Sequence, residues 1–198
     1  MEWDEPLPEY FRPQLESWIS TLAILDQVKV PRCLYPESIV PARRELHVFC
    51  DASEKALGNV AYMRTQAINS RGHVGFISSV SLIALRSGSS IPRLVLCAAV
   101  EEAAAGSKII TELERKPDIV CMHVDSKVIL GYLNNNERRF SKYILRRVDT
   151  ALYYLPVKYW HYVNTKNNPA DFSSRPTKPN DLIVPSWYKG PEMLWGQN

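Results

Sequence analysis

The stretch that most constrains the fold is the continuous apolar run PDIVCMHVD at residues 117–125. A strand that is apolar at successive positions, and not at alternate ones, is typical of a sheet that is covered on both faces. The run therefore predicts a central strand that is buried on both sides and closed by Asp125.

The segments around this run predict the rest of the sheet. Three strands separated by short turns are expected at residues 46–52, 57–65 and 73–83, as a meander. A helix is expected over residues 89–116, with Ser90 as its N-cap and Pro92 in its first turn. Further along the chain we expect a helix at residues 136–155, a strand at 157–163 and a short helix opening in NNPADFSSR at 167–175. This order of elements predicts an α/β fold with a mixed sheet and flanking helices.

The two ends of the chain have a different texture. Residues 1–44 are punctuated by proline. Within them an apolar helix face, entered through Pro13, is formed by Phe11, Leu15, Trp18, Leu22 and Leu25. Residues 30–44 are expected to be an extended connector. Pro, Trp and Gly dominate the segment beyond residue 176, which we expect to be a tail without a core.

Three aspartates stand where elements end or begin. Asp51 and Asp125 each close an apolar strand, and Asp171 lies at the start of a helix. Any one of them alone is better explained as a helix cap or turn residue. Two at the ends of neighbouring buried strands are harder to explain that way, because converging carboxylates repel one another unless a cation holds them. Such oxygen ligands suit Mg²⁺ or Mn²⁺, and two such ions can cleave a phosphodiester.

Composition limits the class of protein. The 198 residues are 45% hydrophobic and 23% charged, as in ordinary globular proteins. No apolar run is long enough to span a bilayer, and the acidic, proline-rich N-terminus does not resemble a secretory signal. The four cysteines form no CxxC pair, and the four histidines lie at no metal-ligand spacing. We therefore expect buried free thiols in a reducing compartment, and neither disulfides nor a zinc site. The histidines are expected to be sheet or surface residues. We expect no membrane and an intracellular location in the cytoplasm or nucleus.

A basic row lies in ERRFSKYILRRVD at residues 137–149, opposite an apolar stripe on the same expected helix. Its members are Arg138, Arg139, Lys142, Arg146 and Arg147. A solvated helix surface is one explanation. The other explanation is contact with nucleic-acid phosphates. The net charge of +3 is compatible with such contact but does not require it.

Four motifs in order, FCDAS, IPRLVLCAAV, HVDSKVILGYL and NPADFSSR, resemble the ribonuclease H domain of BEL/Pao-type retrotransposon polyproteins, over about residues 45–176. Residues 1–44 resemble the connection after that group's reverse transcriptase, and residues 177–198 the stretch before its integrase. The resemblance implies a ribonuclease H-like fold and cleavage of RNA in RNA–DNA hybrids, dependent on Mg²⁺ or Mn²⁺. It also implies reverse transcriptase and integrase regions as polyprotein partners.

The resemblance implies four catalytic carboxylates, of which the metal-binding Asp51, Asp125 and Asp171 are present and the glutamate is replaced by Val95. Glu101 and Glu102 lie six and seven positions further along the helix, and we interpret them as a solvated face. We therefore expect a weak or lost nuclease. The alternative is an inactive nucleic-acid-binding or scaffold module, a pseudoenzyme from a decayed or host-adopted retroelement. An integrase is disfavoured, because NPAD supplies an aspartate where integrases end their acidic set on a glutamate.

Overall fold

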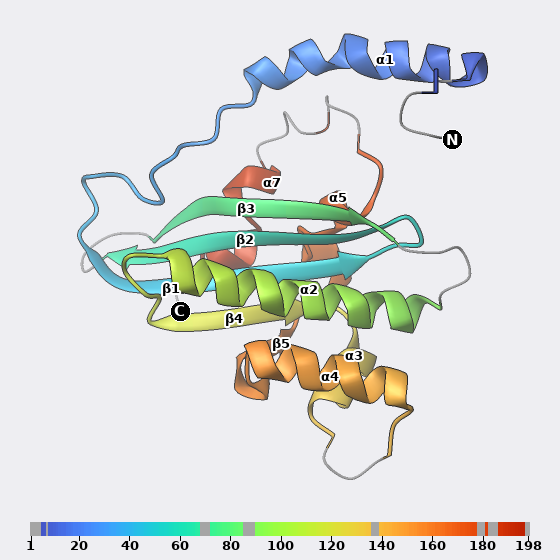
Figure 1. Ribbon diagram of the computed structural model, residues 1–198. Coiled ribbons are helices and arrows are strands. Elements are labelled where there is room, and N and C mark those ends of the chain that lie inside the picture. Colours follow the sequence, from blue (N-terminus) through green and yellow to red (C-terminus); the bar gives the residue numbers. More distant parts are fainter. Residues whose placement is uncertain are drawn as a thin grey trace.

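The computed structural model describes residues 5–6, 8–67, 72–84, 90–135, 139–177, 181 and 186–196 (Figure 1). They contain a five-stranded sheet in the order β3-β2-β1-β4-β5. The strands are β1 (Pro41–Ala52), β2 (Ala56–Ala67), β3 (His73–Ile83), β4 (Ile119–Val124) and β5 (Trp160–Tyr162). The first three form the expected antiparallel meander, and β4 and β5 continue the sheet parallel to β1. The mixed sheet with flanking helices confirms the predicted α/β fold class.

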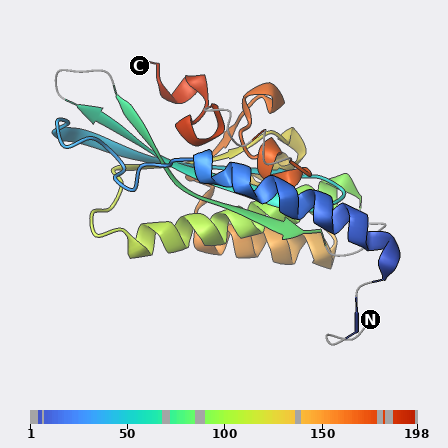
Figure 2. The same cartoon turned by 90° about the horizontal axis from the view of Figure 1, so that it is seen from above.

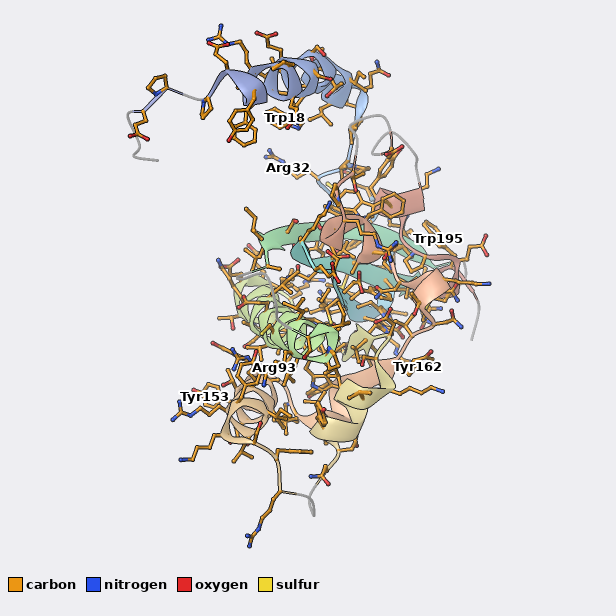
Figure 3. All side chains as sticks on the ribbon, turned by 90° about the vertical axis from the view of Figure 1, so that its right-hand side faces the viewer. Trp18, Arg32, Arg93, Tyr153, Tyr162 and Trp195 are labelled. Atoms are coloured by element: carbon orange, nitrogen blue, oxygen red, sulfur yellow. The ribbon has the colours of Figure 1, made fainter. Side chains whose placement is uncertain are left out.

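Helices cover both faces of this sheet (Figure 2). On one face, α2 (Ile91–Glu112) packs against α4 (Lys142–Tyr154). On the other lie two short helices, α5 (Asp171–Ser174) and α7 (Ser186–Lys189), and the 3-10 turn η5 (Glu192–Leu194). Figure 3 shows Arg93 of α2 on the first side and Trp195, just after η5, on the other.

Two apolar clusters explain why β1 and β4 are apolar at successive positions. Leu46, Val48 and Cys50 of β1 belong to the cluster under α2, whereas Phe49 belongs to the cluster under the C-terminal segment. Because successive side chains of a strand point to opposite faces, both sets of positions must be apolar when both faces are covered. In β4, Met122 and Val124 belong to the first cluster and His123 stacks on Phe49 on the other face. The predicted burial on both sides is therefore confirmed for residues 122–124, whereas residues 119–121 are only partly buried.

Some boundaries differ from the sequence expectations. Helix α3 (Lys127–Leu133) was not expected, although the Ser126 hydroxyl accepts a hydrogen bond from the Ile129 amide at 3.4 Å and so caps the helix. The helix expected at residues 136–155 begins at Lys142, and residues 136–138 lie outside the described part of the chain. A serine cap ahead of a short apolar run was the available signal for α3.

The C-terminal segment packs on the sheet, so the expectation that it contributes no core is wrong for Leu194, which is buried in the second cluster. Arg64 of β2 donates to the backbone oxygens of Leu194 at 2.8 Å and Gly196 at 2.7 Å, and the Tyr62 hydroxyl donates to the Trp187 oxygen at 2.5 Å. The segment is held because it covers the apolar face around Phe49 and Tyr62, which would otherwise meet water.

The expected N-terminal helix is present as α1 (Arg12–Leu22), with Pro13 in its first turn. None of its residues is buried, and Trp18 is 56% exposed. Figure 3 shows α1, with Trp18 labelled, standing apart from the sheet and α2. Among the helices that the structure describes, none is both long and apolar enough to cross a membrane.

Candidate active site

Two of the three aspartates lie side by side because of strand pairing. Cys50 of β1 pairs with Val124 of the parallel strand β4, so the next residues, Asp51 and Asp125, leave the sheet at the same edge. This is the edge to which the β1 arrow points at the right of Figure 1, where α2 also begins. Parallel pairing thus brings together two carboxylates that are 74 positions apart in the sequence.

The third aspartate reaches this edge through α5. Asp171 is the first residue of α5, which packs against β1 and β2. The Ser174 hydroxyl donates to Oδ2 of Asp51. In the segment before α5, the Asn168 side-chain amide donates to the Cys50 oxygen at 2.8 Å. Asp171 is therefore held close to Asp51 by bonds on both sides of it.

The close approach of α5 to the sheet depends on a glycine. A Cβ atom at Gly58 of β2 would lie 2.6 Å from the backbone of both Ser173 and Ser174. Contacts that short do not occur between real atoms, so any larger residue would push α5 away from the sheet. Gly58 therefore helps to set the distance between Asp171 and Asp51.

The three carboxyl groups interact electrostatically. Burial raises the pKa of Asp125, and the negative charge of Asp51 raises it further, against hydrogen bonds from Thr165 and Asn168. Burial also raises the pKa of Asp171, the positive charge of Arg175 opposes this rise, and the charges of Asp51 and Asp125 add to it. Repulsion of this kind is relieved by a cation, and a set of carboxylate oxygens is the donor chemistry that Mg²⁺ and Mn²⁺ prefer.

Arg175 is a competitor for that cation. A guanidinium nitrogen of Arg175 lies 2.6 Å from Oδ1 of Asp171, one helical turn away along the chain. The arginine is 61% exposed, so it can swing into water when another positive charge takes its place.

Val95 faces the strand ends from the other side of the sheet. It lies in the second turn of α2, is 7% exposed, and shares an apolar cluster with Cys50 and Val124, the residues directly before the two aspartates. Its side chain carries no ligand oxygen. At the position where the resemblance implies a glutamate, the structure thus has a packed hydrocarbon.

Glu102 corrects one interpretation of the sequence. Glu101 is exposed as expected, but Glu102 is fully buried, and its Oε1 accepts a hydrogen bond from the His123 amide at 3.1 Å. Burial raises the pKa of this carboxyl well above its ordinary value, which favours its protonated form. The reason is helical geometry: seven residues are almost two full turns, which places Glu102 on the same inward face as Val95.

The basic row divides into exposed and packed members. Arg139, Lys142 and Arg146 are exposed, and Arg138 lies outside the described residues. The Arg147 guanidinium lies 3.6 Å from the centre of the Tyr143 ring, and its Nε donates to Sγ of Cys97 at 3.2 Å. Val148 is buried, which agrees with the apolar stripe expected on the opposite side of the helix.

The histidines are not scattered in space. Nδ1 of His47 and Nε2 of His123 lie 2.9 Å apart on the neighbouring strands β1 and β4, and the His161 ring centre is 6.0 Å from that of His123. All four histidines lie on strands, which confirms the expectation of sheet histidines, whereas the contact between His47 and His123 was not predicted. Sequence spacing could not reveal it, because the pair forms only through the register of β1 against β4.

Comparisons with known proteins agree with this architecture. The model of the Pao retrotransposon-like RNaseH-like domain matches residues 1–126. No curated protein matches the chain. The matched part includes the expected connector, Asp51, Val95 and Asp125, and it ends before Asp171.

Similar solved structures are distant in sequence. The N-terminal RNase H domain of a Mycobacterium tuberculosis protein is 12% identical with a TM-score of 0.46, and covers 70% of this chain and 93% of its own. RNase H1 from Halobacterium salinarum is 13% identical with a TM-score of 0.43, over 73% and 100%. An RNase H1 solved with an RNA/DNA hybrid is 7% identical with a TM-score of 0.43, over 66% and 93%. The family match spans more than half of the chain, which therefore belongs to the family of Pao retrotransposon-like RNase H-like domains.

Proposed function

We propose that this chain is a ribonuclease H-type domain that binds Mg²⁺ or Mn²⁺ and cleaves the RNA strand of RNA–DNA hybrids weakly or not at all. The observation that carries this proposal is the meeting of three aspartates, from β1, from the end of β4 and from α5, in one electrostatically interacting group. Acids at one sheet edge whose pKa values are raised by burial and by neighbouring carboxylates, as those of Asp125 and Asp171 are, are a recognised mark of a functional site.

The chain's residues have distinct roles in this proposal. Asp51, Asp125 and Asp171 hold the ion, which when bound activates water and neutralises the leaving oxygen of a phosphodiester. Ser174 orients the Asp51 carboxylate through its hydroxyl. Without a cation, Arg175 forms an ion pair with Asp171, and this ion pair would open when the metal ion binds.

Val95 is the reason for expecting weak activity. A valine supplies no ligand and places an apolar group beside the strand ends, where the family has a carboxylate. The loss of one stabilising group from a reaction site commonly costs a factor of about 10²–10³ in rate. A site with three aspartates retains the chemistry for holding one ion, whereas the geometry for two is impaired.

The basic row is the proposed contact for nucleic acid. Arg139, Lys142 and Arg146 expose their charges on α4 or just before it, and Arg138 and Arg147 belong to the same sequence row. Helix α4 packs beside α2, whose first turns lie at the aspartate edge (Figure 1). Cations in this position suit the phosphates of a hybrid whose scissile bond lies at the aspartates.

A second function is favoured by the packing of Val95 within an apolar cluster. In this alternative the domain is a pseudoenzyme that binds nucleic acid or acts as a scaffold, beside the reverse transcriptase and integrase regions of a polyprotein or as a host-adopted copy. The two functions differ in cleavage and share hybrid binding.

The deciding experiment is a cleavage assay with end-labelled RNA in an RNA–DNA hybrid, in Mg²⁺ and separately in Mn²⁺. Slow cleavage that disappears in Asp51→Asn and in Asp125→Asn supports the weak nuclease. Hybrid binding without any cleavage supports the second function. Cleavage that persists in both variants contradicts the proposed site.

A further inference from the structure

A second group of ligand-type side chains lies away from the aspartates on β1 and β4. His47 of β1 is the strand partner of Cys121 of β4, and His123 follows Cys121 by two residues on the same strand face. One ligand atom from each of these three side chains lies within 4.8 Å of the other two. His47 and His123 are buried, whereas Cys121 is partly exposed.

The surroundings of His47 resemble those of a metal-bound histidine. Its Nδ1 faces His123, and its Nε2 lies 3.3 Å from Oε2 of Glu45. Glu45 is in turn held by Arg64 at 2.8 Å and by Arg43 at 3.1 Å. A ligating histidine commonly donates its second nitrogen to a carboxylate, which fixes the ring and strengthens the ligand.

His123 provides a second, independent observation. It is 4% exposed, Phe49 stacks on its ring at 4.3 Å, and its Nδ1 has no hydrogen-bond partner among the described residues. Because no group binds Nδ1, the ring proton is free to lie there, which leaves the lone pair of Nε2 for a metal ion. Its other nitrogen, Nε2, faces His47, where a shared ion gives both rings a common partner.

We propose that His47, Cys121 and His123 form a site for Zn²⁺ or a similar borderline-soft divalent cation, separate from the three aspartates. The ion joins β1 to β4 upstream of the strand ends. Nδ1 of His47, Nε2 of His123 and Sγ of Cys121 are its protein ligands. Binding moves the proton that lies between the two imidazoles to Nδ1 of His123 and releases the thiol proton to water.

Donor chemistry decides the type of ion. Two imidazoles and a thiolate suit Zn²⁺, and they do not suit Mg²⁺ or Mn²⁺, which prefer oxygen. Two nitrogens on one tetrahedral zinc lie about 3.3 Å apart at ordinary bond lengths. The observed separation of 2.9 Å therefore needs only a small outward movement of the rings.

The solvent-exposed side of the His47, Cys121 and His123 group gives a metal ion access to the site and offers it a fourth ligand. Cys121 is partly exposed, and His161 on the adjacent strand β5 is exposed to solvent. The His161 ring lies 6.0 Å from that of His123, so either water or His161 completes a tetrahedral set.

The test uses Zn²⁺ and Co²⁺ alone as probes on the full chain, stripped with chelator under reducing conditions. Zn²⁺ affinity is measured by competition with a chromogenic chelator, and Co²⁺ reports a thiolate ligand through its charge-transfer absorption. The variants are Cys121→Ser and His47→Gln. The controls are Cys33→Ser, which removes an exposed cysteine, and Asp51→Asn, which alters the aspartate group.

The expected result is a single equivalent of Zn²⁺ that raises the melting temperature of the wild-type chain. Affinity falls by more than about 10-fold in Cys121→Ser and in His47→Gln, and the Co²⁺ thiolate band disappears in Cys121→Ser. Both controls keep wild-type affinity. Because the readout is Zn²⁺ binding, this result does not depend on nuclease activity.

Three outcomes overturn the proposal. The wild-type chain fails to bind Zn²⁺ more tightly than Cys121→Ser does, or both variants retain the full equivalent. Alternatively, Cys33→Ser or Asp51→Asn removes binding, which places the ion elsewhere. If Cys121→Ser does not fold, His47→Gln and the Co²⁺ spectrum of the wild-type chain decide the question.

Discussion

The Ser174 hydroxyl donates a hydrogen bond to the Asp51 carboxylate, although the two residues are 123 positions apart in the sequence. Ser174 is fully buried, and its own backbone oxygen accepts a bond from the Ser53 hydroxyl at 2.5 Å. The end of β1 and helix α5 are therefore fastened together at the point where the aspartates meet. Disturbing α5 should change the site without touching an aspartate.

Replacing Ser174 with alanine tests this fastening. Ser174→Ala leaves the buried side of Asp51 without its donor, and a lost partner of a charged group costs about 1–3 kcal/mol. We expect the free energy of unfolding to fall by that amount in urea titrations. Thr177→Ala is the matched control, because that hydroxyl donates only to nearby backbone oxygens. An equal loss in both variants would argue against a special role for Ser174.

Val95→Glu should strengthen Mg²⁺-dependent cleavage. The new carboxylate enters at the position where the resemblance implies a glutamate, and the first turns of a helix favour negative charge. Without metal, the variant should be less stable than the parent, because a carboxylate is buried near other acids. Added Mg²⁺ should then raise its melting temperature more than that of the parent.

The matched control is Val95→Gln, which has nearly the same shape and no charge. Cleavage and Mg²⁺ stabilisation should appear in the glutamate variant alone, and Asp51→Asn in that background should remove both. If Val95→Glu binds hybrid normally and cleaves none of it, the loss of function reaches beyond this residue.

Glu102→Gln should stabilise the chain above pH 5. Burial raises the pKa of Glu102 above its usual 4.5, so the unfolded chain releases this proton as pH rises while the folded chain keeps it. The unfolded state then binds fewer protons, and stability falls with rising pH, by at most about 1.4 kcal/mol per pH unit. The amide keeps an oxygen for the His123 amide and does not titrate.

The measurement is urea unfolding between pH 4 and pH 8. The difference between Glu102→Gln and the parent should be small near pH 4 and grow as pH rises. Glu101→Gln is the control, because Glu101 is exposed beside it on the same helix. A constant difference between variant and parent across this range would mean that Glu102 is ionised in the folded chain.

His123 should make the chain sensitive to acid. Burial, together with the charges of His47 and His161, lowers its pKa to about 3. As pH falls below about 6.5, the unfolded chain takes up this proton and the folded chain does not, so stability is lost toward pH 3. His123→Gln should show a weaker loss than the parent when both are unfolded in chelator. An identical pH profile in the two proteins would exclude a buried neutral His123.

The basic row should set the salt dependence of hybrid binding. Each phosphate contact contributes a slope of about 0.9 to the fall of log affinity with log salt. Lys142→Ala with Arg146→Ala should reduce the slope by up to about 2, measured by fluorescence anisotropy. The control pair is Lys108→Ala with Arg115→Ala, at the far end of α2 and beyond it. If the two double variants show equal salt slopes, the basic row does not contact phosphates and serves only solubility.

The sequence by itself determined the elements and their order. The apolar run before Asp125, the meander beginning at Leu46 and the helix that opens near Pro92 follow from local periodicity and helix-start signals. The same patterns placed Asp51 and Asp125 at strand ends, because a strand that ends a buried run delivers its next residue to the sheet edge. Short elements such as α3 were not predicted, because a few residues carry little periodic signal.

Only the tertiary structure decided which distant side chains share an environment. The register of β1 against β4 brings His47 to Cys121, and the packing of α2 on the sheet buries Glu102 beside the His123 amide. The C-terminal segment covers Phe49, and side chains of Arg64 and Tyr62 bind its backbone. Local patterns report which face of an element is apolar, whereas pairing between strands and helices determines what that face meets, and for that reason these contacts could not be read from the sequence.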